Sequence, residues 1–369
     1  MTKVNRQQGF SILELLIALT LGLVVVAGIV QRFTGNSRTY EIVNAQARLQ
    51  ENARYSFQFI TRFARDAGYF GCAPEAELVV KGLNGNWNAI PEYNMSEPID
   101  GFEANGDGTY LPNNLLTLPR TEGGANTNVH VAGNGIDGGG LDPASDILIF
   151  RSLRKPVARL ANRLQPDGDP QVYTPGGSPQ FAVDDVVVVS DCEQAALFRV
   201  TGLGVAGDVT TLAHATNAGG NPFDNGDTIT TYAGDVLPAT MSILGRSYGA
   251  AATVGVFETT IFFIAPSTQA NNAGENINAL WQKSGSRAPV ELVQGVENMQ
   301  VLYGVDSTPN DGITNVNQYS EIQDVADVNA IVVVEVSLDI SSVDALVGTG
   351  GDRLRRTYTN TVSLRNAGV

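Results

Sequence analysis

The stretch FSILELLIALTLGLVVVAGIV, residues 10–30, decides the fold of this chain. It contains 21 residues, and Glu14 carries its only charge. At a rise of 1.5 Å per residue, these residues form a helix of about 31 Å, which is long enough to cross the hydrocarbon core of a bilayer. No small-residue cleavage site of the secretory type follows Val30, so we expect the segment to remain in the protein as a membrane-spanning helix.

Glu14 is the unusual residue of this segment. An ionised carboxylate inside a membrane helix costs about 2.5–3.5 kcal/mol on insertion scales, so such a group normally has a partner. No Lys, Arg or His lies within one helical turn of Glu14. Two interpretations remain open: the carboxylate stays hydrated near the lipid headgroups, or its counter-charge comes from another molecule.

The helix is expected to continue beyond the membrane segment, because no proline occurs between Phe10 and Asp66. One helix of about 57 residues would be about 85 Å long. Over residues 31–67, small and apolar side chains recur at steps of three and four, which predicts an amphipathic helix that packs on the rest of the chain. An exposed coiled coil is the alternative. The helix is expected to end at Ala67-Gly68, a sensible C-cap. The buried stripe is predicted to contain Ile42, Ala45, Leu49, Ala53, Ser56, Ile60, Phe63 and Ala67.

Charge is distributed unevenly along the chain. Residues 1–66 contain eight basic and four acidic residues, a net charge of +4, and the remaining residues carry −19. The total of −15 has the wrong sign for a nucleic-acid binder, which must neutralise phosphate charge. Two Cys and two His are too few for a zinc site of the usual spacing, and we expect no metal and no cofactor.

Catalytic motifs are absent from the sequence, which contains no G-x-S-x-G, H-E-x-x-H or P-loop. His130 and His214 are 84 residues apart in loops rich in Gly and Ala, which does not favour an acid–base pair. Asp-rich turns at Asp100–Gly108, Asp224–Asp227 and Asp306–Gly312 suggest calcium, but none has the EF-hand spacing, and ordinary Asx turns are the favoured interpretation. The chain is therefore not expected to be an enzyme.

The residues after the helix, 68–369, are predicted to form a β-rich globular head. Forty glycines and sixteen prolines indicate strands and loops rather than a helical bundle. Residues 82–145 are predicted to be a glycine-rich loop insertion with short strands. One helix packed on an antiparallel β-sheet gives an α+β fold. The strands are expected at Asp146–Leu153, Ala182–Ser190, Ala196–Thr201, Asp208–Leu212, Thr228–Ala233, Val256–Ile264, Ala279–Lys283, Met299–Gly304, Ala330–Leu338 and Tyr358–Leu364.

The N-terminus resembles a known class of signal. The residues Gly9-Phe10-Ser11-Ile12-Leu13-Glu14-Leu15, behind the short basic leader 1–9, are similar to the type III signal of type IV prepilins and type II secretion pseudopilins. This resemblance implies that a prepilin peptidase cuts after Gly9 and methylates the new amine of Phe10. It also implies that Glu14 pairs with the amino group of a neighbouring subunit during assembly. In a medium of low dielectric constant, the two charges compensate each other's desolvation.

Several further blocks resemble the PilW-type minor pilins of type IV pili. They are residues 49–54 (LQENAR), 68–73 (GYFGCA), 190–193 (SDCE), 291–306 (ELVQGVENMQVLYGVD) and 362–366 (VSLRN). The resemblance implies a minor pilin, held by one pass in the bacterial inner membrane with its head in the periplasm and later part of the pilus. It would help to initiate assembly or sit at the filament tip. The implied partners are the major pilin, other minor pilins, the prepilin peptidase and the inner-membrane assembly machinery.

Cys72 and Cys192 are the only two cysteines. In a cytosolic protein, two isolated cysteines are usually buried and free. In a head exported across the inner membrane, a disulfide between Cys72 and Cys192 is expected. The bond would connect the end of the helix to a strand-bearing part of the head.

Three other functions stay open at this point. A J-type pseudopilin of a type II secretion system would have the same N-terminus, and neighbouring genes would separate the two. A tip adhesin would use the glycine-rich region 82–145 to bind a surface or a glycan. An anchored periplasmic enzyme is the least favoured.

Overall fold

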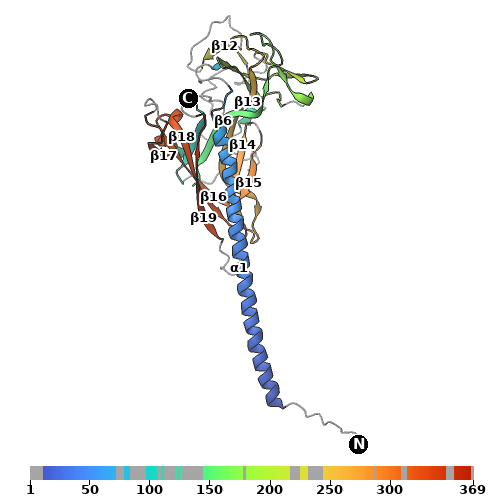
Figure 1. Cartoon of the computed structure of the whole chain (residues 1–369), viewed down its shortest axis with the longest axis vertical. Coiled ribbons are helices and arrows are strands. Elements are labelled where there is room, and N and C mark those ends of the chain that lie inside the picture. Colours follow the sequence, from blue (N-terminus) through green and yellow to red (C-terminus); the bar gives the residue numbers. More distant parts are fainter. Residues whose placement is uncertain are drawn as a thin grey trace.

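The fold consists of one long helix and a head made mostly of antiparallel strands (Figure 1). The α+β prediction is therefore confirmed. The computed structural model describes residues 11–71, 79–83, 97–106, 110–111, 121–122, 125–126, 144–177, 180–216, 225–231, 244–285, 287–308, 314–345 and 353–366.

Helix α1 spans Ile12–Asp66 and has 55 residues. It runs without a break through Gly35 and extends as a stalk below the head (Figure 1). The absence of proline allows this length, because nothing interrupts the backbone hydrogen bonds. After the helix, Gly68 takes the left-handed backbone conformation with φ of 75°, and its N–H donates to the Arg151 carbonyl at 2.9 Å. The predicted end of the helix is confirmed.

The largest sheet has ten strands in the order β12-β1-β9-β8-β13-β6-β2-β3, and β14 extends it from β13 to β15. Among the described strands, every pair in it except β1–β9 is antiparallel. The strands are β1 (Val79–Leu83), β2 (Ile99–Ala104), β3 (Tyr110–Leu111), β6 (Ile147–Arg159), β8 (Val186–Ser190), β9 (Ala195–Arg199), β12 (Asn225–Thr231), β13 (Thr253–Ala270), β14 (Asn276–Ser284) and β15 (Val290–Gln294).

A second sheet of four strands, in the order β17-β16-β18-β19, lies beside α1 (Figure 1). It is formed by β16 (Val296–Val305), β17 (Gln318–Ser320), β18 (Ile331–Ser341) and β19 (Arg355–Ser363), with the 3-10 turns η5 (Ile322–Asp324) and η6 (Val328–Ala330) between β17 and β18. Smaller sheets contain β10 (Gly202–Ala206), β11 (Val209–Ala213) and β7 (Gln171–Tyr173), and β4 (Thr121–Glu122) with β5 (Ala125–Asn126). A further turn, η4, spans Pro175–Gly177.

Strands occur at all ten predicted places, but several of their bounds differ. The prediction of strand for residues 182–185 was wrong. Asp184 has φ of 78°, and the Asp185 carboxylate accepts a hydrogen bond from the Ala182 N–H at 2.8 Å, which makes a turn before β8. Of the segment 82–145, the structure describes residues 82–83, 97–106, 110–111, 121–122, 125–126 and 144–145, which include β2 to β5.

One hydrophobic core joins α1 to both main sheets. Leu49, Ile60 and Ala64 of the helix are at most 1% exposed and belong to the same buried cluster as Phe262 of β13 and Val336 of β18. Burying apolar area of this kind contributes roughly 25 cal/mol per Å². The helix is therefore part of the head's core rather than an attachment to its surface.

Asp146 connects the two main sheets with hydrogen bonds. It lies just before β6, and its carboxylate accepts from the Ala104 N–H of β2 at 3.1 Å and from the Val301 N–H of β16 at 2.8 Å. Burial raises its pKa to about 6, with the charge of Glu321 acting in the same direction and the two backbone hydrogen bonds opposing it. The Asp146 carboxylate thus links the two sheets, but its burial destabilises its ionised form.

Glu103 of β2 belongs to the same group. Burial, and then the charges of Asp146, Glu321 and Asp324, raise the pKa of Glu103 to about 7. We call Glu103, Asp146, Glu321 and Asp324 the acidic cluster. None of the four forms an ion pair with a cation among the described residues. The cluster therefore carries uncompensated negative charge at neutral pH.

The acidic cluster predicts an unusual pH dependence of stability. The pKa values of Glu103 and Asp146 are raised on folding, so the folded state binds protons more tightly than the unfolded state between about pH 4 and 7. Lowering the pH from about 8 to about 5 should increase the free energy of unfolding by about 1–3 kcal/mol, mostly through Asp146, because Glu103 is partly exposed and screened. Denaturant unfolding of the full chain in detergent measures this change.

Glu103→Gln provides the matched variant for this experiment. Removing the charge should stabilise the protein by about 1 kcal/mol at pH 8 and remove the Glu103 share of the pH dependence, while the larger share from Asp146 remains. Glu51→Gln, at an exposed position of α1, should leave both unchanged. A protein that loses stability steadily from pH 8 to pH 5 would contradict this assignment.

The segment after α1 approaches β8 closely. A Cβ atom on Gly71 would lie 2.8 Å from the Cβ atom of Ser190, so only glycine fits there. Cys192 follows Ser190 by two residues, whereas Cys72 lies outside the described residues. The close approach of Gly71 to Ser190 supports the disulfide between Cys72 and Cys192, which stays a prediction.

Mass spectrometry of exported protein digested without reduction should show a peptide pair linked through Cys72 and Cys192. Reducing the bond should lower the free energy of unfolding by about 2–5 kcal/mol, because it releases a loop of more than a hundred residues in the unfolded chain. Cys72→Ser and Cys192→Ser should each have the same effect as reduction. Two alkylatable thiols in the exported, unreduced protein would show that the prediction is wrong.

Candidate functional site

The N-terminal end of α1 carries a capping box. Ser11 is the N-cap, and its hydroxyl oxygen accepts a hydrogen bond from the Leu13 N–H at 3.3 Å. The Glu14 carboxylate accepts one from the Ser11 N–H at 3.4 Å through Oε2. Glu14 is exposed and makes no ion pair with any described residue; Gly9 and Phe10 lie outside the described residues. The structure thus places the Glu14 carboxylate in the first turn of α1, where it accepts one hydrogen bond and has no counter-charge among the described residues.

The first half of α1 exposes its apolar side chains. Between Ile12 and Val30, the large hydrophobic side chains are 50–81% exposed. The helix contains an 18-residue window with a mean hydropathy of 2.6, none of it buried, and among the described residues it is the one helix long and apolar enough to cross a membrane. So large an apolar surface is not stable in water and indicates a site that binds lipid or other proteins.

The second half of α1 is held by the head. Its buried line is formed by Ala45, Leu49, Ala53, Ser56, Ile60 and Ala64, so the predicted stripe is largely confirmed. Ile42, predicted to belong to it, is 39% exposed, because the head begins to cover the helix only at about Ala45. Phe63 meets Phe262 of β13 edge to face, with ring centroids 5.6 Å apart. These contacts fix the direction of the free half relative to the head.

Polar contacts add to this packing. The Asn52 side chain donates to the Gln294 carbonyl at 3.0 Å, and the Lys155 ammonium group lies 2.5 Å from the Asp66 carboxylate. Such contacts position the helix more than they stabilise it, because exposed ion pairs contribute only about 0–1 kcal/mol.

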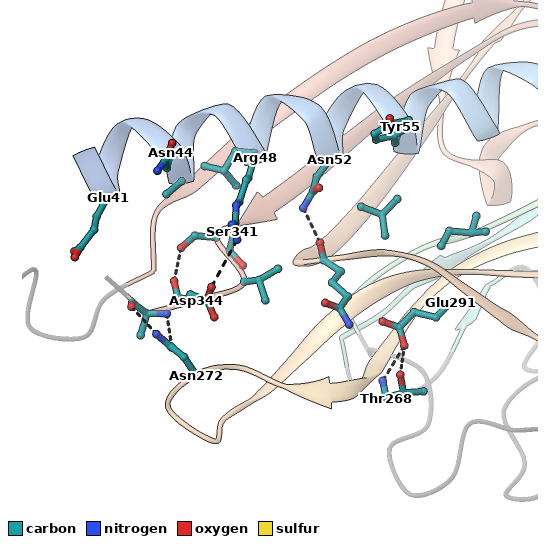
Figure 2. A pocket seen from close by; sticks show the side chains of 18 of the residues that line it. Glu41, Asn44, Arg48, Asn52, Tyr55, Thr268, Asn272, Glu291, Ser341 and Asp344 are labelled. Carbon is teal, nitrogen blue, oxygen red and sulfur yellow. Dashed lines mark hydrogen bonds and ion pairs between the residues drawn. The ribbon is translucent and has the colours of Figure 1, made fainter. Parts of the chain in front are cut away.

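A groove of about 1070 Å³ lies along α1 where the helix enters the head. Figure 2 shows Arg48 pointing across it towards Asp344, at 3.8 Å, with Asn272 below them. The Asn272 side chain holds the loop after β18 at both backbone groups of Ala345, accepting from its N–H at 2.9 Å and donating to its carbonyl at 3.2 Å. The opposite wall is formed by the edge strand β15, which includes Glu291.

Hydrogen bonds engage the Glu291 carboxylate of the groove. Burial alone would raise the pKa of Glu291, but hydrogen bonds from the Thr268 N–H and from the Thr268 and Ser267 hydroxyls outweigh it and hold the pKa below its usual value. A carboxylate that is ionised and fully engaged is a poor proton donor or acceptor near neutral pH. Glu291 therefore holds the Ser267–Thr268 segment in place rather than serving as a proton donor or acceptor.

The other candidate residues have structural roles. His214 is buried and bonded to Asp169 at 2.9 Å, and burial lowers its pKa despite the nearby carboxylate; His130 lies outside the described residues. Asp100 pairs with the buried Arg151, and Asp306 accepts from the Thr308 and Asn315 N–H groups as in an Asx turn. Within the part of the chain that the structure describes, no three Asp, Glu, His or Cys side chains could hold a metal ion together.

The sequence contained a signal for one feature that we did not predict. Ser11-Ile12-Leu13-Glu14 has the S-x-x-E spacing of a capping box ahead of an apolar run, so the hydrogen bond to Glu14 could have been predicted. The groove could not, because its walls come from α1, β15 and the loop after β18, which are far apart in the sequence.

Two family models match the chain. Residues 4–30 match the prokaryotic N-terminal methylation motif, and residues 261–349 match PilW, the type IV pilus-assembly protein W. No significant match emerged with any curated protein or with any solved structure. The PilW segment runs from within β13 through β18 and contains every head residue that lines the groove. Together with the apolar helix, these matches support a type IV pilus minor pilin of the PilW kind.

Proposed function

We propose that this protein is cut after Gly9 and N-methylated at Phe10 by a prepilin peptidase, and that it then helps to initiate pilus assembly or occupies the filament tip. The observation that carries the proposal is the first part of α1, residues 12–30, whose large hydrophobic side chains are all exposed and whose one carboxylate, Glu14, has no ion-pair partner among the described residues. Such a helix needs a bilayer before assembly and other helices afterwards. The head, residues 68–369, would face the periplasm before extraction.

The geometry at Glu14 supports a role in subunit contact. The hydrogen bond from Ser11 uses Oε2, and no described residue bonds to Oε1. Cleavage before Phe10 would create a positive amine at the start of each mature helix. A neighbour's amine would then supply the cation that Glu14 lacks, and the pairing would matter most in an interior of low dielectric constant. The capping box holds the Glu14 carboxylate at the first turn of α1, where the amine of such a neighbour would approach.

The size of the head favours an end of the filament. A filament uses a heterologous contact that repeats, so each subunit presents two different surfaces to its neighbours. A head of about 300 residues is too bulky to be repeated at every position of a filament shaft. The partners proposed are the major pilin, other minor pilins and the inner-membrane assembly machinery. The match to a pilus-assembly family favours this function over a pseudopilin of a secretion system.

Glu14→Ala and Glu14→Gln should both insert into the inner membrane and yet be at least about tenfold depleted from sheared filaments. Glutamine can still accept the hydrogen bond from Ser11, as in other capping boxes, so this variant removes the charge and keeps the cap. Immunoblots of sheared filaments and of membranes measure the two pools. Glu51→Gln is the matched control and should enter filaments normally. Normal incorporation of Glu14→Gln would show that the carboxylate charge is not required.

Mass spectrometry of filament-associated protein should find an N-terminal peptide that begins with methylated Phe10. Gly9 is the residue that the peptidase must accept, so a bulky substitution there should leave the leader attached and the protein in the membrane. Filaments that contain the protein with residues 1–9 still present would contradict the proposed processing.

A further inference from the structure

A second groove, of about 630 Å³, lies along α1 near the end of the helix. It is lined by residues from Tyr55 to Asp66 of the helix and by Arg365, which follows β19. Three exposed arginines line it: Arg62, Arg65 and Arg365. We call this groove the arginine groove.

The positive charge of the arginine groove is not neutralised by any part of the chain that the structure describes. Arg62 stacks on the Phe63 ring at 5.8 Å, but no carboxylate among the described residues pairs with Arg62, Arg65 or Arg365. The one acid in the groove, Asp66, is engaged by Lys155 at 2.5 Å. Three guanidinium groups around one concave surface attract a ligand that carries several carboxylates or phosphates.

Lipid headgroups are too far away to be that ligand. Arg62 follows Val30 by 32 residues of continuous helix, so it lies about 48 Å beyond the apolar half. This distance is several times the Debye length of about 8 Å at physiological salt. A nucleic acid is also disfavoured, because the chain after residue 66 carries −19 and would repel a polyanion around the groove.

A compact acidic protein surface fits these constraints. The head of this chain offers acidic side chains of this kind, because Glu103, Glu321 and Asp324 of the acidic cluster are at least partly exposed and have no cation partner among the described residues, whereas Asp146 of the cluster is buried. A heterologous contact requires two different, complementary surfaces on each subunit. The arginine groove is formed by α1 and the C-terminal segment, whereas the acidic cluster is formed by β2, β6 and η5 with the residues next to them.

We propose that the arginine groove receives the acidic face of the head of a neighbouring pilin subunit. The inference rests on the proposed function, since it takes the neighbour to be another pilin. It goes beyond that function by assigning a docking surface on the head that is separate from Glu14. Complementary charge at such a surface mainly selects the partner and sets the register of the contact.

The test is photo-crosslinking of the full chain in cell membranes. Gln58 is exposed, uncharged and lines the groove, so a photo-reactive amino acid at this position should crosslink to the proposed partner. The cells carry their other pilins but an inactivated assembly motor, so that the contact is measured before polymerisation. Mass spectrometry should identify an acidic peptide from a protein with a prepilin-type N-terminus.

Charge reversal provides the decisive comparison. Arg62→Glu with Arg65→Glu should lower the crosslink yield about tenfold, because like charges now face each other. Arg159→Glu with Arg163→Glu makes the same change in net charge at exposed positions outside the groove and should leave the yield within about twofold. Changing the acidic residues at the crosslinked site of the partner to lysine should restore the yield of the first variant.

Three results would overturn the inference: equal yields in the two charge-reversal variants, crosslinks only to nucleic acid or lipid, or no crosslink from Gln58. These results are distinct from a failure of the proposed function. That function fails if the charge of Glu14 is dispensable in filaments, an outcome that does not depend on the membrane crosslink. Equal thermal midpoints of the two variants would confirm that the substitutions leave the fold intact.

Discussion

The packing of α1 between the two main sheets determines the arrangement of the whole molecule. Leu49 and Ile60 provide buried apolar area, and Ala53 and Ala64 allow the helix backbone to come close to the strands. The helix shares one core with β13 of the ten-stranded sheet and with β18 of the four-stranded sheet. Because the same helix continues without a break below the head, this core also fixes the direction in which the apolar half leaves it.

The two halves of α1 therefore lie in different environments. Above about Ala45 its small and apolar side chains face the head, and below that point no described part of the chain covers it. The polar contacts of Asn52 and Arg48 lie at the transition, beside the groove along α1. A continuous helix transmits any movement of its lower half to the head, so membrane anchoring and extraction would act on a rigid unit.

Local sequence determines the features that could be predicted. The length of α1 follows from an uninterrupted run without proline, and the centres of most strands follow from short runs of apolar and β-branched residues. The wrong start of β8 came from Asp184, whose positive φ no apolar pattern reveals. The arrangement of the strands in two sheets could not be predicted. The hydrogen bond that connects the two sheets runs from the Val301 N–H to Asp146, and these residues are 155 positions apart in the sequence. The arginine groove likewise combines Arg62 with Arg365, which become neighbours only through the pairing of β19 with β18.

Three sites on this chain carry charge that forms no ion pair with any residue the structure describes: the Glu14 carboxylate, the acidic cluster and the three arginines of the arginine groove. Stability of the isolated subunit does not explain them, since the acidic cluster weakens the folded state at neutral pH and exposed unpaired arginines contribute little to it. Other charges of the chain do pair with each other, as Arg151 does with Asp100 and Lys155 with Asp66, but none of the described ion pairs involves these three sites. The proposed contacts between subunits would account for this pattern, because a heterologous assembly can join the positive surface of one protomer to a negative surface of the next. On this view the fold holds the charges apart, and assembly pairs them.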